Sequence, residues 1–90
     1  MKKCVVTVVG KDTVGIIAKV CSYLADTDIN ILDISQTIID DFFNMMMIVD
    51  IERSNKPFDQ VSNDLEKIGE DIGVVVKCQK EEIFDMMHRI

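Results

Sequence analysis

The segment CVVTVVGKDTVGIIAKVCSYL, residues 4–24, decides the fold because it predicts a strand, a turn and an amphipathic helix in immediate succession. The strand, Cys4–Val9, is apolar and mostly β-branched, which is typical of a central strand covered on both faces. Gly10 is expected to end it. The helix that follows carries an apolar stripe at helical spacing, which we expect to pack against the sheet. The members of this stripe are Ile17, Val20, Cys21 and Leu24.

The turn GKDTVG, residues 10–15, is where we expect the function to lie. The first backbone N–H groups of a helix lack acceptors within it, so a helix start can hold an anion or a carboxylate. Asp12 is expected to cap this helix. Gly15 falls within the first helical turn, where glycine costs about 1 kcal/mol relative to alanine. Either close approach of a ligand or another backbone, or tight packing of the helix on the sheet, would explain it.

The composition predicts a single domain, residues 1–90, that associates with a second copy of itself. A hydrophobic fraction of 48% is high for so short a chain, so we expect apolar surface to be buried between the subunits of a homodimer. The net charge of -6 repels phosphate backbones and anionic lipid surfaces. Neither a nucleic acid nor a membrane is therefore expected as a partner.

Three cysteines and three consecutive methionines are expected to pack in the core rather than bind metal. Cys4, Cys21 and Cys78 lack the spacing of metal ligands, and the chain holds one histidine. Neighbouring strand residues point to opposite faces, so Met45–Met47 cannot converge on one ion. We therefore expect no metal and no cofactor. The cysteine pattern, with no recognisable signal peptide, predicts a cytoplasmic protein.

The middle of the chain predicts a β-hairpin. Ile29–Asp40 alternates between apolar and polar residues, which is typical of a half-exposed edge strand. Its apolar face holds Leu32, Ile34 and Ile38, and its polar face holds Asp33, Ser35 and Thr37. Phe42–Ile51 is apolar on both sides and belongs in the middle of the sheet. Asp40 and Asp41 fit a tight turn between the two strands, but without a glycine the turn type stays open.

The C-terminal half predicts a helix, a strand and a short terminal helix. Pro57 at the first helical position opens the helix and Gly73 ends it. The apolar stripe of this helix consists of Phe58, Val61, Leu65, Ile68 and Ile72. Val74–Gln79 is the fourth strand. Glu81–Ile90 is too short to be stable alone and is expected to dock as a terminal helix.

The order β-α-β-β-α-β predicts an α+β fold, a ferredoxin-like sandwich. Right-handed crossovers turn this order into a four-stranded antiparallel sheet with both helices on one face. The first and third strands are central in that topology. They are also the two most apolar segments, so the hydrophobic pattern and the topology agree.

The segments GKDTVGIIAKV (10–20) and INILDISQ (29–36) resemble the ACT domain, a small regulatory module that binds amino acids, and the resemblance spans nearly the whole chain. More narrowly, three segments together are similar to a family of stand-alone bacterial and archaeal ACT-domain proteins. These segments are VVGKDTVGIIA (8–18), DISQTIIDDFFNMMM (33–47) and IFDMMHRI (83–90). The relatives of that family include the N-terminal domain of formyltetrahydrofolate deformylase and the glycine cleavage system transcriptional repressor.

The resemblance implies a homodimer that pairs through the second strand and the first helix. Effectors would bind where the glycine turn of one subunit meets the second strand of the other. Carried over by position, the ligand-binding residues are Asp12, Val14 and Gly15 from one chain with Asn30, Ile31 and Leu32 from the other. Many ACT domains have proline before the helix glycine, and Val14 departs from this pattern, which affects the rigidity of the turn and the ligand preference.

The function implied by the resemblance is a non-catalytic regulatory module that binds an amino acid or a similar metabolite and acts on a separate protein partner. The alternative is a degenerate dimer that mediates only protein–protein interaction. Acylphosphatases share the architecture but place an arginine in the turn, where this chain offers Lys11. The turn is neither a P-loop nor a dinucleotide-binding turn, and no acid–base pair is evident, so no enzyme is expected. RNA binding would require basic and aromatic residues on Cys4–Val9, which has none.

Overall fold

Six main elements follow one another in the predicted order. The computed structural model describes residues 1–11 and 14–82. The elements are β1 (Lys3–Lys11), α1 (Ile16–Asp26), β2 (Asn30–Ile39), β3 (Phe42–Asp50), α2 (Phe58–Ile72) and β4 (Val74–Lys80). Glu81 and Glu82 are helical, and the rest of the predicted terminal helix, residues 83–90, lies outside the described part of the chain.

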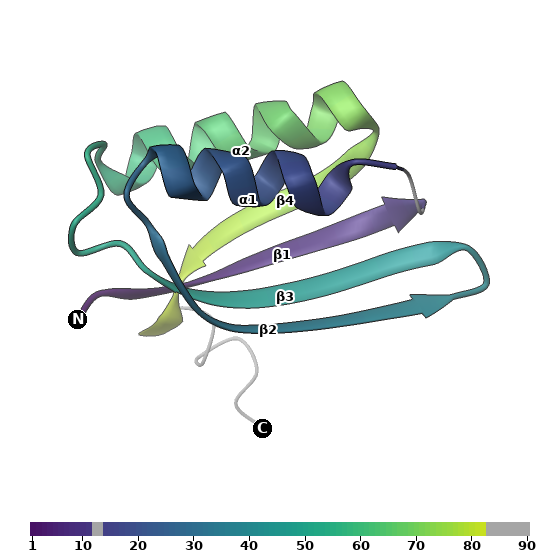
Figure 1. Ribbon diagram of the computed structural model, residues 1–90, viewed down its shortest axis with the longest axis horizontal. Coiled ribbons are helices and arrows are strands. Elements are labelled where there is room, and N and C mark those ends of the chain that lie inside the picture. Colours follow the sequence, from purple (N-terminus) through teal and green to yellow (C-terminus); the bar gives the residue numbers. More distant parts are fainter. Residues whose placement is uncertain (12–13, 83–90) are drawn as a thin grey trace.

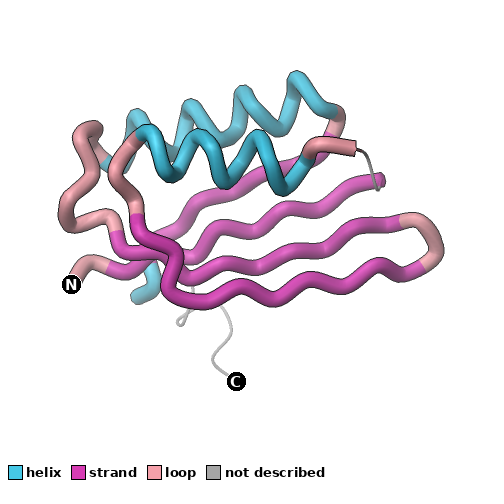
Figure 2. Tube along the Cα trace, in the orientation of Figure 1, coloured by secondary structure: helices cyan, strands magenta, loops and turns pink. Residues whose placement is uncertain are grey.

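The four strands form one antiparallel sheet in the order β2-β3-β1-β4, so β1 and β3 are central as predicted. Both helices cover the same face of the sheet and run side by side (Figure 1). Neither α1 nor α2 lies on the opposite face (Figure 2). The ferredoxin-like βαββαβ sandwich is confirmed.

The core lies between the sheet and the two helices, and it is built from alternate residues of the central strands. Val6 and Val8 of β1 and Met47 and Val49 of β3 are each 0% exposed. Because cross-strand partners lie on the same face, pairs such as Val6 and Met47 stack directly under the helices. From α2, Val61 and Leu65 of the predicted stripe are buried, and the stripe's other members are half-buried.

Helix α1 packs on the sheet through a stripe that differs from the predicted one at its start. Ile16, Val20 and Leu24 are buried, whereas Ile17 is 38% exposed, so the prediction that Ile17 faces the sheet is wrong. The helix begins at Ile16, and its inward face follows the i, i+4, i+8 series from that residue. Cys21 is half-buried and packs at the border of the core.

Gly10 lies inside β1, which continues to Lys11, so the prediction that Gly10 ends the strand is wrong. It pairs with Phe43 on one side and with Val74 on the other. A Cβ at this position would lie 2.7 Å from the Val74 Cγ1 atom. Glycine therefore lets β4 begin close to β1, and the strand does not need to stop there.

The burial of the methionines follows the alternation of side chains along a strand, and the cysteines are free thiols. Met45 and Met47 are buried and Met46 is 42% exposed on the other face, so two of the three methionines pack in the core. Cys4 and Cys78 are buried and all three cysteines are free thiols. Contact with the Cys4 thiol, together with burial, raises the pKa of Cys78. No group of three histidine, cysteine or acidic side chains is placed to hold a metal ion within residues 1–11 and 14–82.

The turns between elements show why particular residues occupy them. Asp40 and Asp41 have φ angles of 48° and 69°, and positive φ at both positions defines a type I′ hairpin turn, which aspartate tolerates. Pro57 is the N-cap residue of α2 rather than its first helical residue. Gly73 ends α2 as predicted. Neither α1 nor α2, the helices found in the described ranges, has the length and apolarity needed to cross a membrane.

Asp64 on α2 ties the two helices and the preceding loop together. The Tyr23 hydroxyl donates a hydrogen bond of 2.7 Å to its carboxylate, and Gln60 donates another of 2.7 Å. The Lys56 ammonium lies 3.2 Å away. The hydrogen bond from Tyr23 is the main reason why the pKa of Asp64 is lowered, and burial is the main reason why the pKa of Tyr23 rises to about 12.

Candidate functional site

The β1–α1 turn ends in a left-handed residue. Gly15 is the N-cap of α1, with φ 92° and ψ 1°. The prediction placed it within the first helical turn, but the helix begins one residue later, at Ile16. A Cβ on Gly15 would meet nothing within 4 Å. Tight packing of the helix on the sheet therefore does not explain this glycine. The backbone conformation does, because side-chain-bearing residues rarely adopt a positive φ.

The start of α1 is marked by its first backbone hydrogen bond. The first bond of the helix runs from the Lys19 N–H to the Gly15 carbonyl at 3.0 Å. The N–H groups that precede Lys19 have no acceptor within the helix, and Gly15 supplies no capping side chain. The cap position falls three residues beyond Asp12, which itself lies outside the described residues. Val14, which precedes Gly15, is 99% exposed, so an apolar side chain lies in solvent beside the helix start.

The two halves of the predicted site lie at opposite ends of the sheet in one chain. Lys11 pairs with Phe42 beside the β2–β3 hairpin, so the Gly15 turn follows that end. Asn30 pairs with Asp50, whose other partner is Lys3, at the far end. Figure 1 shows the same separation, with α1 beginning at one end of β2 and finishing at the other. A single chain therefore does not bring Gly15 and Asn30 together.

Strand β2 contains a β-bulge at the predicted site. Ile31 pairs with Val49 and Asp33 with Ile48, which leaves Leu32 as the extra residue. Ile34 and Ile38 pair with the buried residues Met47 and Phe43 and so face the helix side of the sheet, as one face of the predicted alternation, whereas Leu32 has no partner on β3. Ile31 is half-buried and packs against the core.

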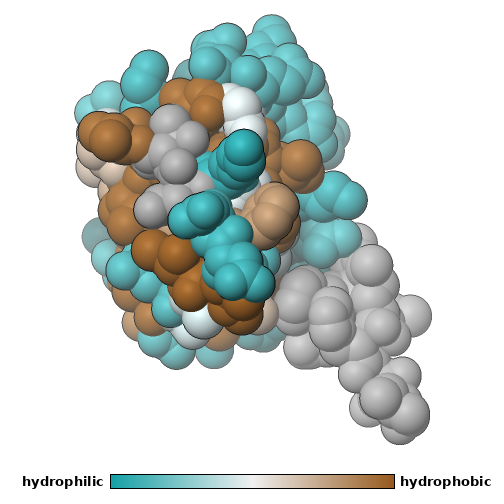
Figure 3. Space-filling view, turned by 90° about the vertical axis from the view of Figure 1, so that its right-hand side faces the viewer, coloured by the Kyte–Doolittle hydropathy of each residue, from teal (hydrophilic) through white to brown (hydrophobic). Residues whose placement is uncertain are grey.

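An apolar surface runs along the β2 edge and the start of α1. No residue of β2 is buried, and its outer backbone edge pairs with no described strand. The exposed fractions are 39% for Leu32, 45% for Ile34 and 57% for Ile38, with Val14 and Ile17 adding to this surface from the turn and helix. Figure 3 looks at the hairpin end of the molecule and shows hydrophobic surface interrupted by hydrophilic residues.

Arg53 lies at the Asn30 end of the sheet, and the sequence analysis missed it. A shallow cavity is lined by Asp28, Ile29, Asn30 and Arg53. The Asn55 amide donates a hydrogen bond of 3.4 Å to the Asp28 carboxylate at this end. The predicted topology could have located Arg53, because β3 ends beside the start of β2, and the loop that follows β3 therefore lies near Asn30.

Comparisons with known proteins agree with this fold. The sequence profile of the ACT domain matches residues 2–79. The chain is 60% identical to a UPF0237 protein of Bifidobacterium longum over 90 residues, which is 100% of both chains. It is similar to the solved ACT domain protein from Streptococcus pneumoniae, with a TM-score of 0.81 and 38% identity, over 93% of this chain and 94% of that one.

Two more distant structures share the fold alone. A formyltetrahydrofolate deformylase from Pseudomonas syringae matches with a TM-score of 0.80 and 21% identity, over 88% of this chain and 27% of that one. A protein assigned as a glycine cleavage system transcriptional repressor matches with a TM-score of 0.74 and 22% identity, over 88% of this chain and 45% of that one. From the matching profile, the close relative and the shared fold, the chain belongs to the ACT-domain family and, within it, to the UPF0237 group.

Proposed function

We propose that this protein is a non-catalytic regulatory module that forms a homodimer and binds an amino acid or a similar small metabolite at two equivalent sites between its subunits. One observation carries the proposal. The helix start at Gly15 and the β2 start at Asn30 lie at opposite ends of the sheet, and no described strand covers the outer edge of β2. A two-fold axis that pairs β2 with the partner's β2 in antiparallel fashion brings each turn to the other subunit's Asn30.

The apolar β2 edge supports this arrangement. A single chain exposes hydrophobic side chains to water along this edge and at the start of α1. They are Val14, Ile17, Ile34 and Ile38. Pairing β2 with a second copy would bury that surface and satisfy the free backbone groups of the edge strand. The result is an eight-stranded sheet with all four helices on one face.

The chemistry of the two halves is complementary to an amino acid. The N–H groups at the start of α1 favour a carboxylate. The partner subunit's Asn30 and Asp28 offer oxygen atoms that can accept hydrogen bonds from the ammonium group, and Arg53 of the partner subunit adds a positive charge beside them. Binding would then strengthen the dimer by mass action. The regulatory output would pass to a separate protein partner in the cytoplasm.

The second candidate function is a dimer that mediates only protein–protein contact. The same apolar edge favours it, because that edge needs a partner whether or not a ligand binds. The two candidates differ in their response to metabolites. A regulatory module is stabilised by its ligand, and an interaction module is not.

A thermal-shift screen of the purified protein against amino acids, nucleotides and folates tests the proposal. A rise in melting temperature with one class of amino acid is expected, and light scattering of the same sample should show that the dimer persists at lower protein concentration with the ligand present. A dimer that no compound stabilises would favour the interaction module. Stabilisation by ligand in a strictly monomeric sample would place the site within one subunit.

A further inference from the structure

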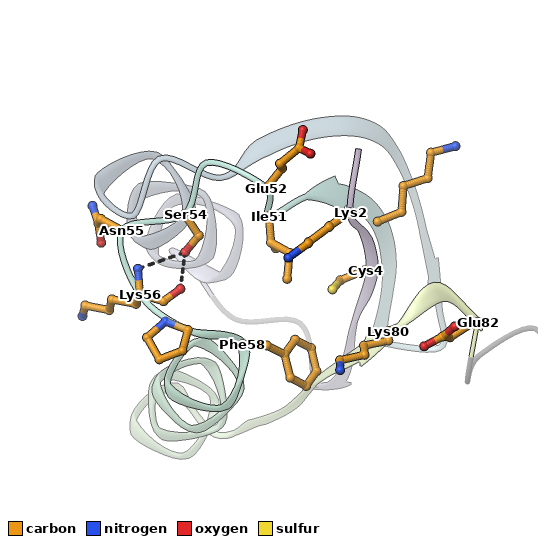
Figure 4. A pocket seen from close by; sticks show the side chains of 12 residues that line it. Lys2, Cys4, Ile51, Glu52, Ser54, Asn55, Lys56, Phe58, Lys80 and Glu82 are labelled. Carbon is orange, nitrogen blue, oxygen red and sulfur yellow. Dashed lines mark hydrogen bonds between the residues drawn. The ribbon is translucent and has the colours of Figure 1, made fainter.

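A cavity of about 700 Å³ lies at the same end of the sheet as Asn30, and no residue of β2 lines it. It is framed by the start of β1, the loop after β3, the first turn of α2 and the end of β4. Its volume falls within the range of small-molecule sites, roughly 300–1,000 Å³. Figure 4 shows Lys2 and Lys80 on opposite sides of the Cys4 sulfur, with Phe58 close to Lys80.

The charged residues of this cavity are mostly positive, in a chain whose net charge is -6. Four lysines line it, against two glutamates: Lys2, Lys3, Lys56 and Lys80, with Glu52 and Glu82. Glu52 is engaged by the N-terminal ammonium at 3.5 Å, and Lys56 is engaged by Asp64 at 3.2 Å. Among the described residues, no acidic side chain forms an ion pair with Lys2, Lys3 or Lys80. Local positive charge therefore remains for an anion.

The floor beneath these lysines is apolar. Ile51, Pro57 and Phe58 line the cavity, and the Lys80 ammonium lies 5.4 Å from the centroid of the Phe58 ring. The cation–π contact holds the charge directly above an aromatic surface. Helix α2 begins here at Pro57 without a capping side chain, and the positive end of its dipole adds to the field of the lysines.

We propose that this cavity is a second ligand site, which takes a small organic anion with a compact apolar body. The carboxylate lies between Lys2 and Lys80, and the body rests on Phe58 and Ile51. The cavity is lined by residues of β1, β4 and the loop after β3, whereas the proposed amino-acid site uses the β2 edge, and the two sites share no lining residue. One dimer can therefore hold both kinds of ligand at once, and the two sites can be separated by experiment.

The test is a titration of the full-length, nitrogen-15-labelled protein with benzoate, followed by NMR, beside a titration with the neutral analogue benzamide. Benzoate should shift the amide signals of Cys4, Phe58 and Lys80 and bind at least five-fold more tightly than benzamide. The double variant Lys2→Gln/Lys80→Gln should weaken benzoate at least five-fold and leave benzamide unchanged.

The matched control removes the same two charges elsewhere. Lys67 and Lys77 are exposed and lie outside the cavity, so Lys67→Gln/Lys77→Gln should bind benzoate like the wild type. Equal affinity for benzoate and benzamide would overturn the proposal, as would equal weakening by the two double variants. Shifts confined to Gly15 and Asn30 would also overturn it, because they would assign benzoate to the other site.

Discussion

At the scale of single residues, Gly15 has a structural role that does not depend on ligand binding. Its φ of 92° means that a side chain there strains the backbone, so Gly15→Leu will lower stability by about 1–2 kcal/mol whether or not the turn binds a ligand. A fall in melting temperature in this variant therefore says nothing about the ligand site. Asn30 is exposed and free of that constraint, so it is the better residue on which to test binding.

Asn30→Ala should weaken the best ligand of the thermal-shift screen by about 1–3 kcal/mol, because polar groups of the ligand lose their partner. The unliganded variant should melt like the wild type. Calorimetric titration of both proteins measures the difference. The control is Asn63→Ala on α2, an exposed asparagine that should leave the affinity unchanged. Unaltered binding by Asn30→Ala would place the site elsewhere.

Gly69 is the residue at which helix α2 approaches β4 most closely. A Cβ there would lie 2.7 Å from the Val74 carbonyl oxygen and 2.8 Å from the Val76 Cγ2 atom. Gly69→Ala should therefore lower the free energy of unfolding by about 1–3 kcal/mol, as overpacking does, although alanine favours a helix by about 1 kcal/mol. Urea unfolding measures this change. Glu70→Ala, at the exposed neighbouring position, should change little, and a gain in stability for Gly69→Ala would contradict the close contact.

At the scale of elements, the Asp64 network predicts how the packing of α1 on α2 depends on pH. The folded protein lowers the pKa of Asp64, first through the hydrogen bond from Tyr23, so this carboxylate stabilises the fold above its unfolded pKa near 3.8. The contribution is lost as the pH falls through the lower, folded value. Tyr23 keeps its proton up to a pKa of about 12, so the hydrogen bond persists through neutral and mildly alkaline pH.

Tyr23→Phe tests this link. The variant should be less stable than the wild type at pH 6, and the difference should shrink as the pH falls from 5 toward 2, because the wild type then loses the stabilisation that the variant already lacks. Urea unfolding at several pH values measures it. Glu66→Gln, an exposed position on the same helix, serves as the control for a change of charge. A difference that stays constant with pH would rule out the Tyr23–Asp64 bond as its cause.

At the scale of the whole molecule, the apolar β2 edge predicts the oligomeric state. The chain has a mass of 10.2 kDa, and light scattering at micromolar concentration should give twice that mass. Ile34→Lys/Ile38→Lys should produce folded monomers, because two charges then lie in the apolar surface that the partner subunit would cover. Val75→Lys is the matched control, since Val75 is 59% exposed on β4 at the other edge of the sheet, and it should remain dimeric. A monomeric wild type would refute the proposed dimer.

Much of the fold could be read from the sequence because it depends on local patterns. The continuous apolar runs of β1 and β3 identified the central strands, and the alternation in β2 identified an edge strand. Gly73 marked the end of α2 because a left-handed C-cap is a local requirement. The order of the elements, with right-handed crossovers, then permitted one sheet topology. The family followed from motifs at the β1–α1 turn and along the β2–β3 hairpin.

Only the tertiary structure decided the features that depend on residues far apart in the chain. Gly10 is a glycine because Val74 of β4 lies beside it, and nothing near Gly10 in the sequence indicates that approach. The bulge at Leu32 depends on the register between β2 and β3. Arg53 lines one cavity with Asn30, and Lys2 lines another with Lys80, because segments that are separated in the sequence reach the same end of the sheet. Local hydrogen bonding and periodicity specify elements, whereas packing and register determine which side chains share a site.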